Sequence, residues 1–110
     1  MHRFYISYRE SQPKIPSRDG KRFTEVFKHG TLSVGLYEPR GTDLQTSHTR
    51  DEGYIVVKGK GEFLNGNDRV KFSAGDFLFA ATGEVHRFKN FSDDLSVWVI
   101  FYGPEGGEKV

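Results

Sequence analysis

Residues 75–90 read GDFLFAATGEVHRFKN, and this stretch decides the fold. Residues 76–80 are strongly apolar and residues 84–91 alternate in character, as expected for two short strands around a turn. In the second strand, Arg87 and Lys89 share one face while His86 and Phe88 share the other. Because the two cations prefer water, we expect His86 to point into the protein.

The rest of the chain repeats this pattern of short apolar segments separated by turn residues. Gly66-Asn67-Asp68 is typical of a hairpin turn, and no segment shows a helical period of useful length. The pattern therefore predicts an all-β protein, either a sandwich or a barrel. The other expected strands cover residues 31–38, 52–58, 61–65, 69–72 and 95–102, with a short extended piece at residues 46–48.

Length and composition limit what the chain can be. Its 110 residues suffice for one domain, and 10 Phe and 5 Tyr supply large side chains for a core. A net charge of +1 without a basic stripe argues against nucleic-acid binding. There is no Cys, so any metal must bind nitrogen and oxygen ligands. Apolar runs such as residues 97–102 are too short for a membrane span, and no secretion signal is evident, so we expect a cytoplasmic protein.

The chain divides into three parts. Residues 1–22 differ from the rest and predict an N-terminal arm, in which Tyr5, Ile6 and Tyr8 form an edge strand. Its second half is polar and broken by Pro13 and Pro16. Residues 23–103 are expected to form the β domain, the barrel if the fold is one, and residues 104–110 are expected to be a frayed C-terminal tail.

One group of polar residues is expected to converge inside the barrel. Glu52, Tyr54 and Val56 share a strand face, which makes Glu52 an inward carboxylate that needs a cation or strong donors. His48 lies four residues before Glu52, and His86 comes from another strand. Two imidazoles and one carboxylate suit a divalent first-row metal, so we predict a metal site at His48, Glu52 and His86.

Two sequence motifs resemble those of the cupins. The first cupin motif is a His-x-His pair followed by Glu and Gly, and His48, Glu52 and Gly59 match it from the second His onward. The second motif runs Gly, Pro-x-Gly, His and Asn, and residues 75–90 match every spacing. The resemblance covers about residues 31–102 and implies a double-stranded β-helix, or jelly-roll, barrel that holds one divalent ion, namely Fe, Mn, Zn or Ni.

The chain departs from these motifs at three positions. Thr46 stands where the first His ligand belongs, Ala81 replaces Pro, and Gly41 lies one residue from the usual opening glycine. Thr46 is a candidate to hold a metal-bound water. The amide oxygen of Gln45, one residue out of register, is a candidate additional ligand. The loss of one ligand leaves open positions on the metal for substrate or water.

The resemblance implies several functions. A 2-His-1-Glu site fits a small-molecule enzyme with dioxygenase-, isomerase- or lyase-type chemistry, in which Glu52 is also the candidate catalytic residue. Tyr54, Phe88 and Trp98 are candidates to line the substrate pocket. The alternatives are a small-molecule binding or sensing cupin without catalysis, and a degenerate cupin without metal. Exposed strand edges and the N-terminal arm favour a homodimer.

Overall fold

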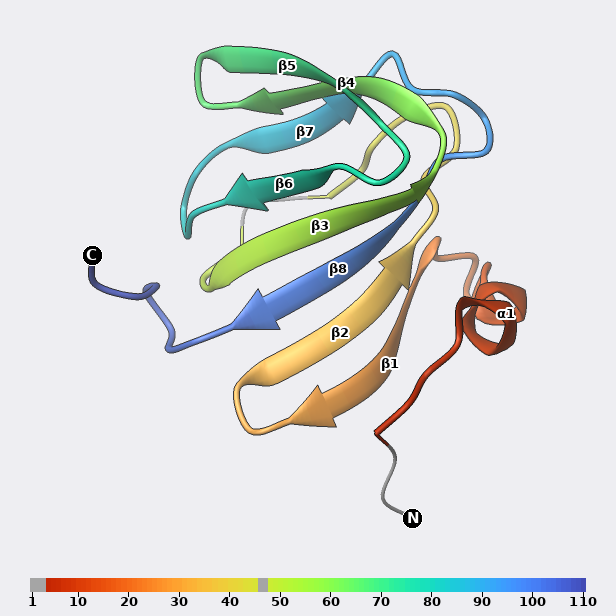
Figure 1. Ribbon diagram of the computed structural model, residues 1–110, viewed down its shortest axis with the longest axis horizontal. Coiled ribbons are helices and arrows are strands. Elements are labelled where there is room, and N and C mark those ends of the chain that lie inside the picture. Colours follow the sequence, from red (N-terminus) through yellow and green to blue (C-terminus); the bar gives the residue numbers. More distant parts are fainter. Residues whose placement is uncertain (1–3, 46–47) are drawn as a thin grey trace.

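The computed structural model describes residues 4–45 and 48–110. These residues form eight strands in two antiparallel sheets, which confirms the all-β prediction (Figure 1). The five-stranded sheet has the order β1 (Phe23–His29), β2 (Leu32–Tyr37), β8 (Ser96–Tyr102), β3 (Asp51–Lys58) and β6 (Phe77–Ala80). The three-stranded sheet has the order β5 (Asp68–Ser73), β4 (Lys60–Asn65) and β7 (His86–Lys89).

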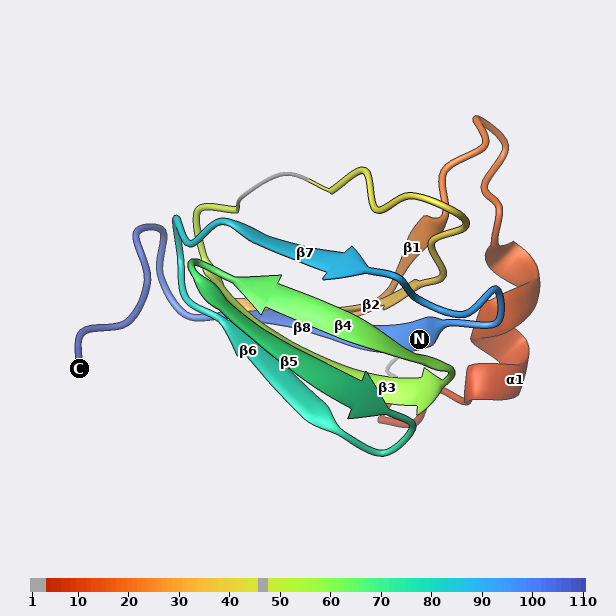
Figure 2. The ribbon, with the colours of Figure 1, turned by 90° about the horizontal axis from the view of Figure 1, so that it is seen from above.

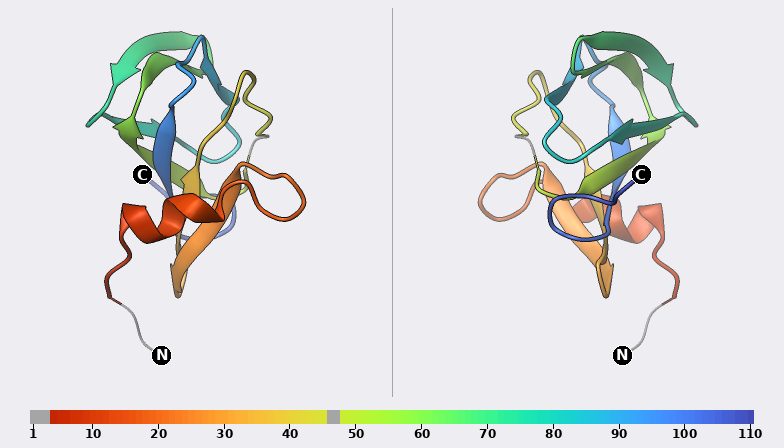
Figure 3. Two further views of the ribbon diagram at one scale, coloured as in Figure 1. Left: turned by 90° about the vertical axis from the view of Figure 1, so that its right-hand side faces the viewer. Right: turned by 90° about the vertical axis from the view of Figure 1, so that its left-hand side faces the viewer.

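The two sheets curl around a shared apolar core (Figure 3). The Tyr54 ring on β3 contacts the Phe88 ring on β7 at 5.0 Å and the Phe63 ring on β4 at 5.6 Å between centroids. All three side chains are buried, and each contributes about 1.5–3 kcal/mol by leaving water. Further core residues are Val56, Phe72, Leu78, Ala80, Leu95, Val97 and Val99.

The strand registers place two predicted ligands on facing sheets. On β3, Glu52 pairs with Phe101 of β8 and with Ala80 of β6, so its side chain points toward the core side. His86 is the first residue of β7 and pairs with Asn65 of β4. The candidate site therefore lies between the sheets.

The N-terminal edge strand predicted from Tyr5, Ile6 and Tyr8 is wrong. A one-turn helix, α1 (Tyr8–Ser11), begins at Tyr8 and is followed by the 3₁₀ turn η1 (Gln12–Lys14), at one end of the barrel (Figure 2). Ser7 Oγ accepts from the backbone N–H of Glu10 at 3.0 Å, and the Glu10 carboxylate accepts from the Ser7 N–H at 2.9 Å. This reciprocal capping satisfies donors at the helix start. The edge strands of the large sheet are β1 and β6 instead.

The helix α1 is attached to the barrel through a buried carboxylate. Glu38, just after β2, accepts from the Tyr8 hydroxyl at 3.0 Å and from Ser96 Oγ at 2.7 Å. The Tyr8 ring also meets Trp98 edge-on, with 6.1 Å between ring centroids. Trp98 therefore packs under the arm, on the face of β8 opposite the core residues Val97 and Val99.

The C-terminal tail is tied to the barrel rather than frayed. Asp51 accepts hydrogen bonds from the backbone N–H groups of Glu108 and Thr82, at 2.8 and 2.9 Å. These two donors hold the pKa of the Asp51 carboxyl below its usual value. Within the described part of the chain, neither helical segment is long and apolar enough to cross a membrane.

Candidate metal centre

The three predicted ligands converge. His86 Nε2 lies 3.0 Å from Glu52 Oε1, and His48 Nε2 lies 3.8 Å from Glu52 Oε2. One potential ligand atom from each of the three residues lies within 4.8 Å of the other two. Each imidazole thus faces a different oxygen of one carboxylate, an arrangement that one small cation can bridge.

Local contacts fix where each ligand sits. Two hydrogen bonds hold the backbone of His48. Its carbonyl oxygen accepts from the Gly83 N–H at 3.1 Å and from Thr82 Oγ1 at 3.3 Å. The turn between β6 and β7 thus holds the segment that precedes β3. Phe101 on β8 packs edge-on against the His48 ring, with 4.9 Å between centroids. His48 remains partly exposed, while Glu52 and His86 are buried.

The protonation of His86 is what makes the site suited to a metal. Its Nδ1 lies 2.9 Å from the carbonyl oxygen of Glu84, which can only accept, so Nδ1 carries the proton. A neutral His86 then has its lone pair on Nε2, directed at Glu52 Oε1. Both atoms are buried and lack a hydrogen-bond partner among the described residues. Two facing acceptors need a proton or a metal ion between them, and two His and one Glu provide suitable ligands for a divalent first-row ion.

The same arrangement alters the affinity of His86 for protons. Burial on its own lowers the pKa of this imidazole, but the Glu52 carboxylate and the Glu84 carbonyl more than offset it, and the pKa is raised above 6.5. A proton and a metal ion compete for the same lone pair, so the raised pKa reports how strongly this position attracts positive charge.

A chain of hydrogen bonds runs from Tyr54 through Gln45 beside the candidate metal site. The Tyr54 hydroxyl donates to Gln45 Oε1 at 2.8 Å, and Gln45 Nε2 donates to the buried Asp43 Oδ2 at 2.7 Å. Because the Asp43 carboxylate only accepts, the Gln45 amide oxygen must face Tyr54. Burial, followed by the nearby Glu52 charge, raises the pKa of Tyr54, so this phenol stays protonated. Gln45 therefore lies beside the site with its oxygen already engaged, while Thr46 lies outside the described residues.

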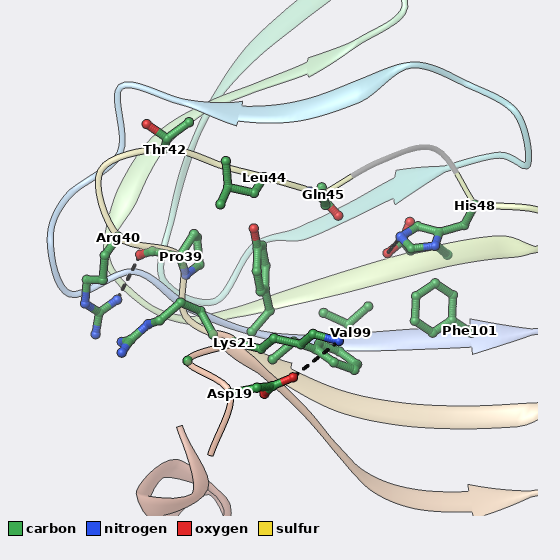
Figure 4. A pocket seen from close by; sticks show the side chains of 15 residues that line it. Asp19, Lys21, Pro39, Arg40, Thr42, Leu44, Gln45, His48, Val99 and Phe101 are labelled. Carbon is green, nitrogen blue, oxygen red and sulfur yellow. Dashed lines mark hydrogen bonds and ion pairs between the residues drawn. The ribbon is translucent and has the colours of Figure 1, made fainter. Parts of the chain in front are cut away.

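A pocket of about 690 Å³ opens beside the triad (Figure 4). Of the predicted pocket residues, Tyr54 and Phe88 lie in the core behind it, and Trp98 lies outside the sheet under α1, so none lines it. Gln45, His48 and Glu52 do line it. The other lining residues are Asp19, Gly20, Lys21, Arg22, Phe23, Tyr37, Pro39, Arg40, Thr42, Leu44, Val99 and Phe101.

Several of these lining residues were not predicted from the sequence. Phe101 could have been found, since it shares the inner face of its strand with Val97 and Val99. No local pattern marks the basic residues Lys21, Arg22 and Arg40, because they come from segments that meet only in the folded chain.

Two antiparallel sheets around a 2-His-1-carboxylate cluster and an adjoining pocket define a β-barrel protein with a candidate metal site. Residues 33–102 match the model of the cupin domain family, and the chain belongs to that family. An uncharacterized protein of Streptomyces coelicolor is 32% identical over 98 residues, which cover 87% of this chain and 92% of the relative.

Solved structures support the same fold. A conserved protein with a double-stranded β-helix domain from Klebsiella pneumoniae has a TM-score of 0.73 at 18% identity, covering 92% of this chain and 90% of its own. A cupin-2 domain protein from Shewanella frigidimarina has a TM-score of 0.70 at 14% identity, and the match covers 89% of this chain and 94% of that protein's chain. At these identities the likeness shows the fold alone, which is the predicted double-stranded β-helix barrel.

Proposed function

We propose that this cupin is a metal-dependent enzyme that acts on a small organic molecule. His48, Glu52 and His86 would hold one divalent first-row ion. The observation that carries the proposal is a pair of buried atoms without a hydrogen-bond partner among the described residues, His86 Nε2 and Glu52 Oε1, which lie 3.0 Å apart. Glu52 also lines a pocket of about 690 Å³. When neither a proton nor a metal ion lies between these atoms, the pair costs about 1–3 kcal/mol for each unsatisfied group.

The side chains around the site have distinct roles in this proposal. A bound ion would supply Lewis-acid chemistry, as an isomerase or lyase needs, or redox chemistry, as a dioxygenase needs. Glu52 brings its negative charge to the site, and His86 is held in the correct tautomer by Glu84. Phe101 and Val99 make part of the pocket wall apolar.

One observation also favours a second function, ligand binding or sensing without turnover. The two phenols near the site are both committed, because Tyr54 donates to Gln45 and Tyr37 donates to Asp43 at 2.5 Å. Burial and Asp43 raise the pKa of Tyr37, so neither phenol provides a base. Among the described pocket residues, Glu52 is then the main candidate for moving a proton.

Elemental analysis of the purified protein tests the metal. We expect close to one divalent ion per chain in the wild type, and its loss in His48→Ala, Glu52→Ala and His86→Ala. His29→Ala on the exposed end of β1 is the matched control and should keep its metal. Iron would favour the dioxygenase, whereas manganese, zinc or nickel would favour an isomerase or lyase. Protein that holds no metal and cannot be reloaded would overturn the proposal and leave a degenerate cupin.

Turnover separates the enzyme from the sensor. Metal-loaded protein is incubated with panels of small organic acids, phenols and sugars, and the mixtures are analysed by mass spectrometry. We expect a product that the metal-free protein does not form. A compound that binds tightly but is recovered unchanged would favour the sensing function instead.

A further inference from the structure

The pocket has two chemically different ends. His48 lies at one end and Arg40 at the other, with Leu44 and Gln45 between them along one side (Figure 4). The end that holds His48 and Glu52 is the candidate metal centre described above. The opposite end has no part in that centre, and it contains Arg40 together with Arg22, which shares Glu38 as a partner with it. Lys21 also lines the pocket.

The charges at this second end do not cancel. Arg22 and Arg40 share one buried partner, Glu38, whose Oε1 lies 4.0 Å and 3.8 Å from their guanidinium nitrogens. Lys21 pairs with Asp19 at 3.7 Å on the exposed rim. Three cations thus face two carboxylates, and one positive charge remains. A monoanion would neutralise it, whereas a dianion would leave a negative excess.

The two guanidinium groups are held in place by backbone carbonyls. Arg22 Nε donates to the Glu38 carbonyl oxygen at 2.8 Å. Arg40 Nη1 donates to the carbonyl oxygens of Pro39 and Leu95 at 2.9 and 3.2 Å. Each group keeps further N–H donors, because a guanidinium has five. Donors fixed before a ligand arrives lose less entropy when they bind it, and they suit planar anions such as carboxylates.

The walls between the two ends are mainly apolar. Phe23, Tyr37 and Phe101 present rings, and Pro39 and Val99 add aliphatic surface. Gly35 on β2 makes room for one of these rings, since a Cβ there would lie 2.3 Å from the Phe23 ring. A hydroxyl-rich sugar would leave its polar groups unpaired against such walls, whereas an apolar or aromatic body would fit them.

We propose that the pocket binds a small carboxylic acid with an apolar body. Its carboxylate lies against Arg22 and Arg40, and its other end reaches the His48–Glu52–His86 centre. This proposal deepens the proposed function, since it names the substrate class of the same pocket. It can nevertheless fail or stand by itself, because the basic end shares no residue with the metal ligands.

Calorimetric binding of three probes with one aromatic body tests the proposal. Phenylacetate, its neutral isostere phenylacetamide and the dianion-forming phenyl phosphate are titrated into metal-loaded and metal-stripped protein. We expect phenylacetate to bind best in both. Arg40→Gln should weaken phenylacetate about tenfold to a hundredfold, as for the loss of a charged hydrogen bond, and should leave phenylacetamide unchanged.

Two further variants show whether a loss of binding in Arg40→Gln comes from the pocket or from misfolding. Arg69→Gln removes a guanidinium that pairs with Glu62 at 3.5 Å on the other sheet, and it should not change phenylacetate binding. Lys21→Gln alters an exposed side chain, so it keeps the fold and should weaken phenylacetate by a smaller factor. Thermal unfolding of each variant checks that it is folded.

The outcomes separate this proposal from the metal proposal. Equal affinity for the acid and the amide, tighter binding of phenyl phosphate, or no binding of any probe would overturn the carboxylate site. A preference for the acid that depends on Arg40 in protein that cannot hold metal would support the carboxylate site and reject the metal enzyme.

Discussion

Glu52 places a buried carboxylate oxygen opposite a buried histidine nitrogen, an arrangement that fits the proposed metal ion better than it fits a metal-free core. Its Oε1 is buried 3.0 Å from His86 Nε2, and neither atom has a hydrogen-bond partner among the described residues. At a pH where His86 is neutral, no donor lies between these two acceptors, and the buried pair destabilises the fold. Residues that destabilise a fold locally are common where a protein must bind a ligand.

A single substitution of Glu52 separates its effect on stability from its effect on metal binding. In metal-stripped protein at alkaline pH, where His86 is neutral, Glu52→Gln supplies an amide N–H that can donate to His86 Nε2. We expect the free energy of unfolding to rise by about 1 kcal/mol, measured by chemical denaturation. In the same variant, metal affinity should fall, because a charged ligand has been lost.

The control for this substitution is a carboxylate that already has partners. Glu62 accepts from Asn90 Nδ2 at 2.8 Å and pairs with Arg69 at 3.5 Å. Glu62→Gln should therefore leave stability unchanged or lower it slightly, and it should not alter metal content. Equal destabilisation by the two substitutions would contradict the view that Glu52 faces an unsatisfied acceptor.

At the residue scale, strand alternation predicted the inward placement of Glu52 and His86 but not the outward placement of Trp98. His86 could be oriented because Arg87 and Lys89 mark the solvent face of its strand. Trp98 could not, since β8 is apolar on both faces and alternation alone does not say which one is inner. In the structure, α1 covers the outer face, and Trp98 packs beneath it.

At the element scale, the N-terminal helix shows how a short signal can be missed. Tyr5, Ile6 and Tyr8 suggested a strand, yet Ser7 and Glu10 form a capping box that begins α1. That Ser-x-x-Glu spacing is visible in the sequence, but one helical turn has no apolar period to accompany it. The central strands were predicted closely, as β3 shows: residues 52–58 were expected and Asp51–Lys58 is observed.

The attachment of α1 to the barrel can be tested through Tyr8. Tyr8→Phe keeps the ring contact with Trp98 and removes the hydroxyl that bonds to Glu38 at 3.0 Å. We expect the free energy of unfolding to fall by about 1 kcal/mol and amide exchange in residues 8–14 to become faster. The control is Tyr102→Phe, which removes a hydroxyl from β8 instead of from α1. Unchanged exchange in residues 8–14 would show that the hydroxyl does not hold the helix.

The contact between β1 and β2 gives a second test at this scale. A Cβ at Gly35 would lie 2.3 Å from the Phe23 ring and 2.9 Å from the Thr24 carbonyl oxygen. We expect Gly35→Ala to cost about 1–3 kcal/mol by displacing both. A Cβ at Gly53 on β3 would lie 3.0 Å from the exposed Phe77 ring, which can move, and at an ordinary 3.8 Å from the Leu78 carbonyl oxygen, so Gly53→Ala should cost much less. Equal losses in denaturation experiments would contradict this packing.

At the scale of the whole molecule, one face of the five-stranded sheet exposes apolar side chains. Phe77 is 62% exposed, and Phe79 and Ile55 are each 40% exposed. Phe77 and Phe79 lie on the edge strand β6, and Ile55 pairs with Phe77 from β3. Adjacent apolar residues beside an open strand edge are typical of a surface that another chain covers.

We therefore predict a homodimer in which a second copy covers this face. Light scattering at micromolar concentration should give twice the chain mass of 12.6 kDa. Phe77→Asp should shift the mass toward the monomer, because it places a carboxylate in the contact. Val70→Asp alters a residue that is 50% exposed on β5 in the other sheet, and it should leave the dimer intact. A monomeric wild type would mean that the exposed rings of β6 face solvent or another partner, and loss of the dimer in both variants would place the contact elsewhere.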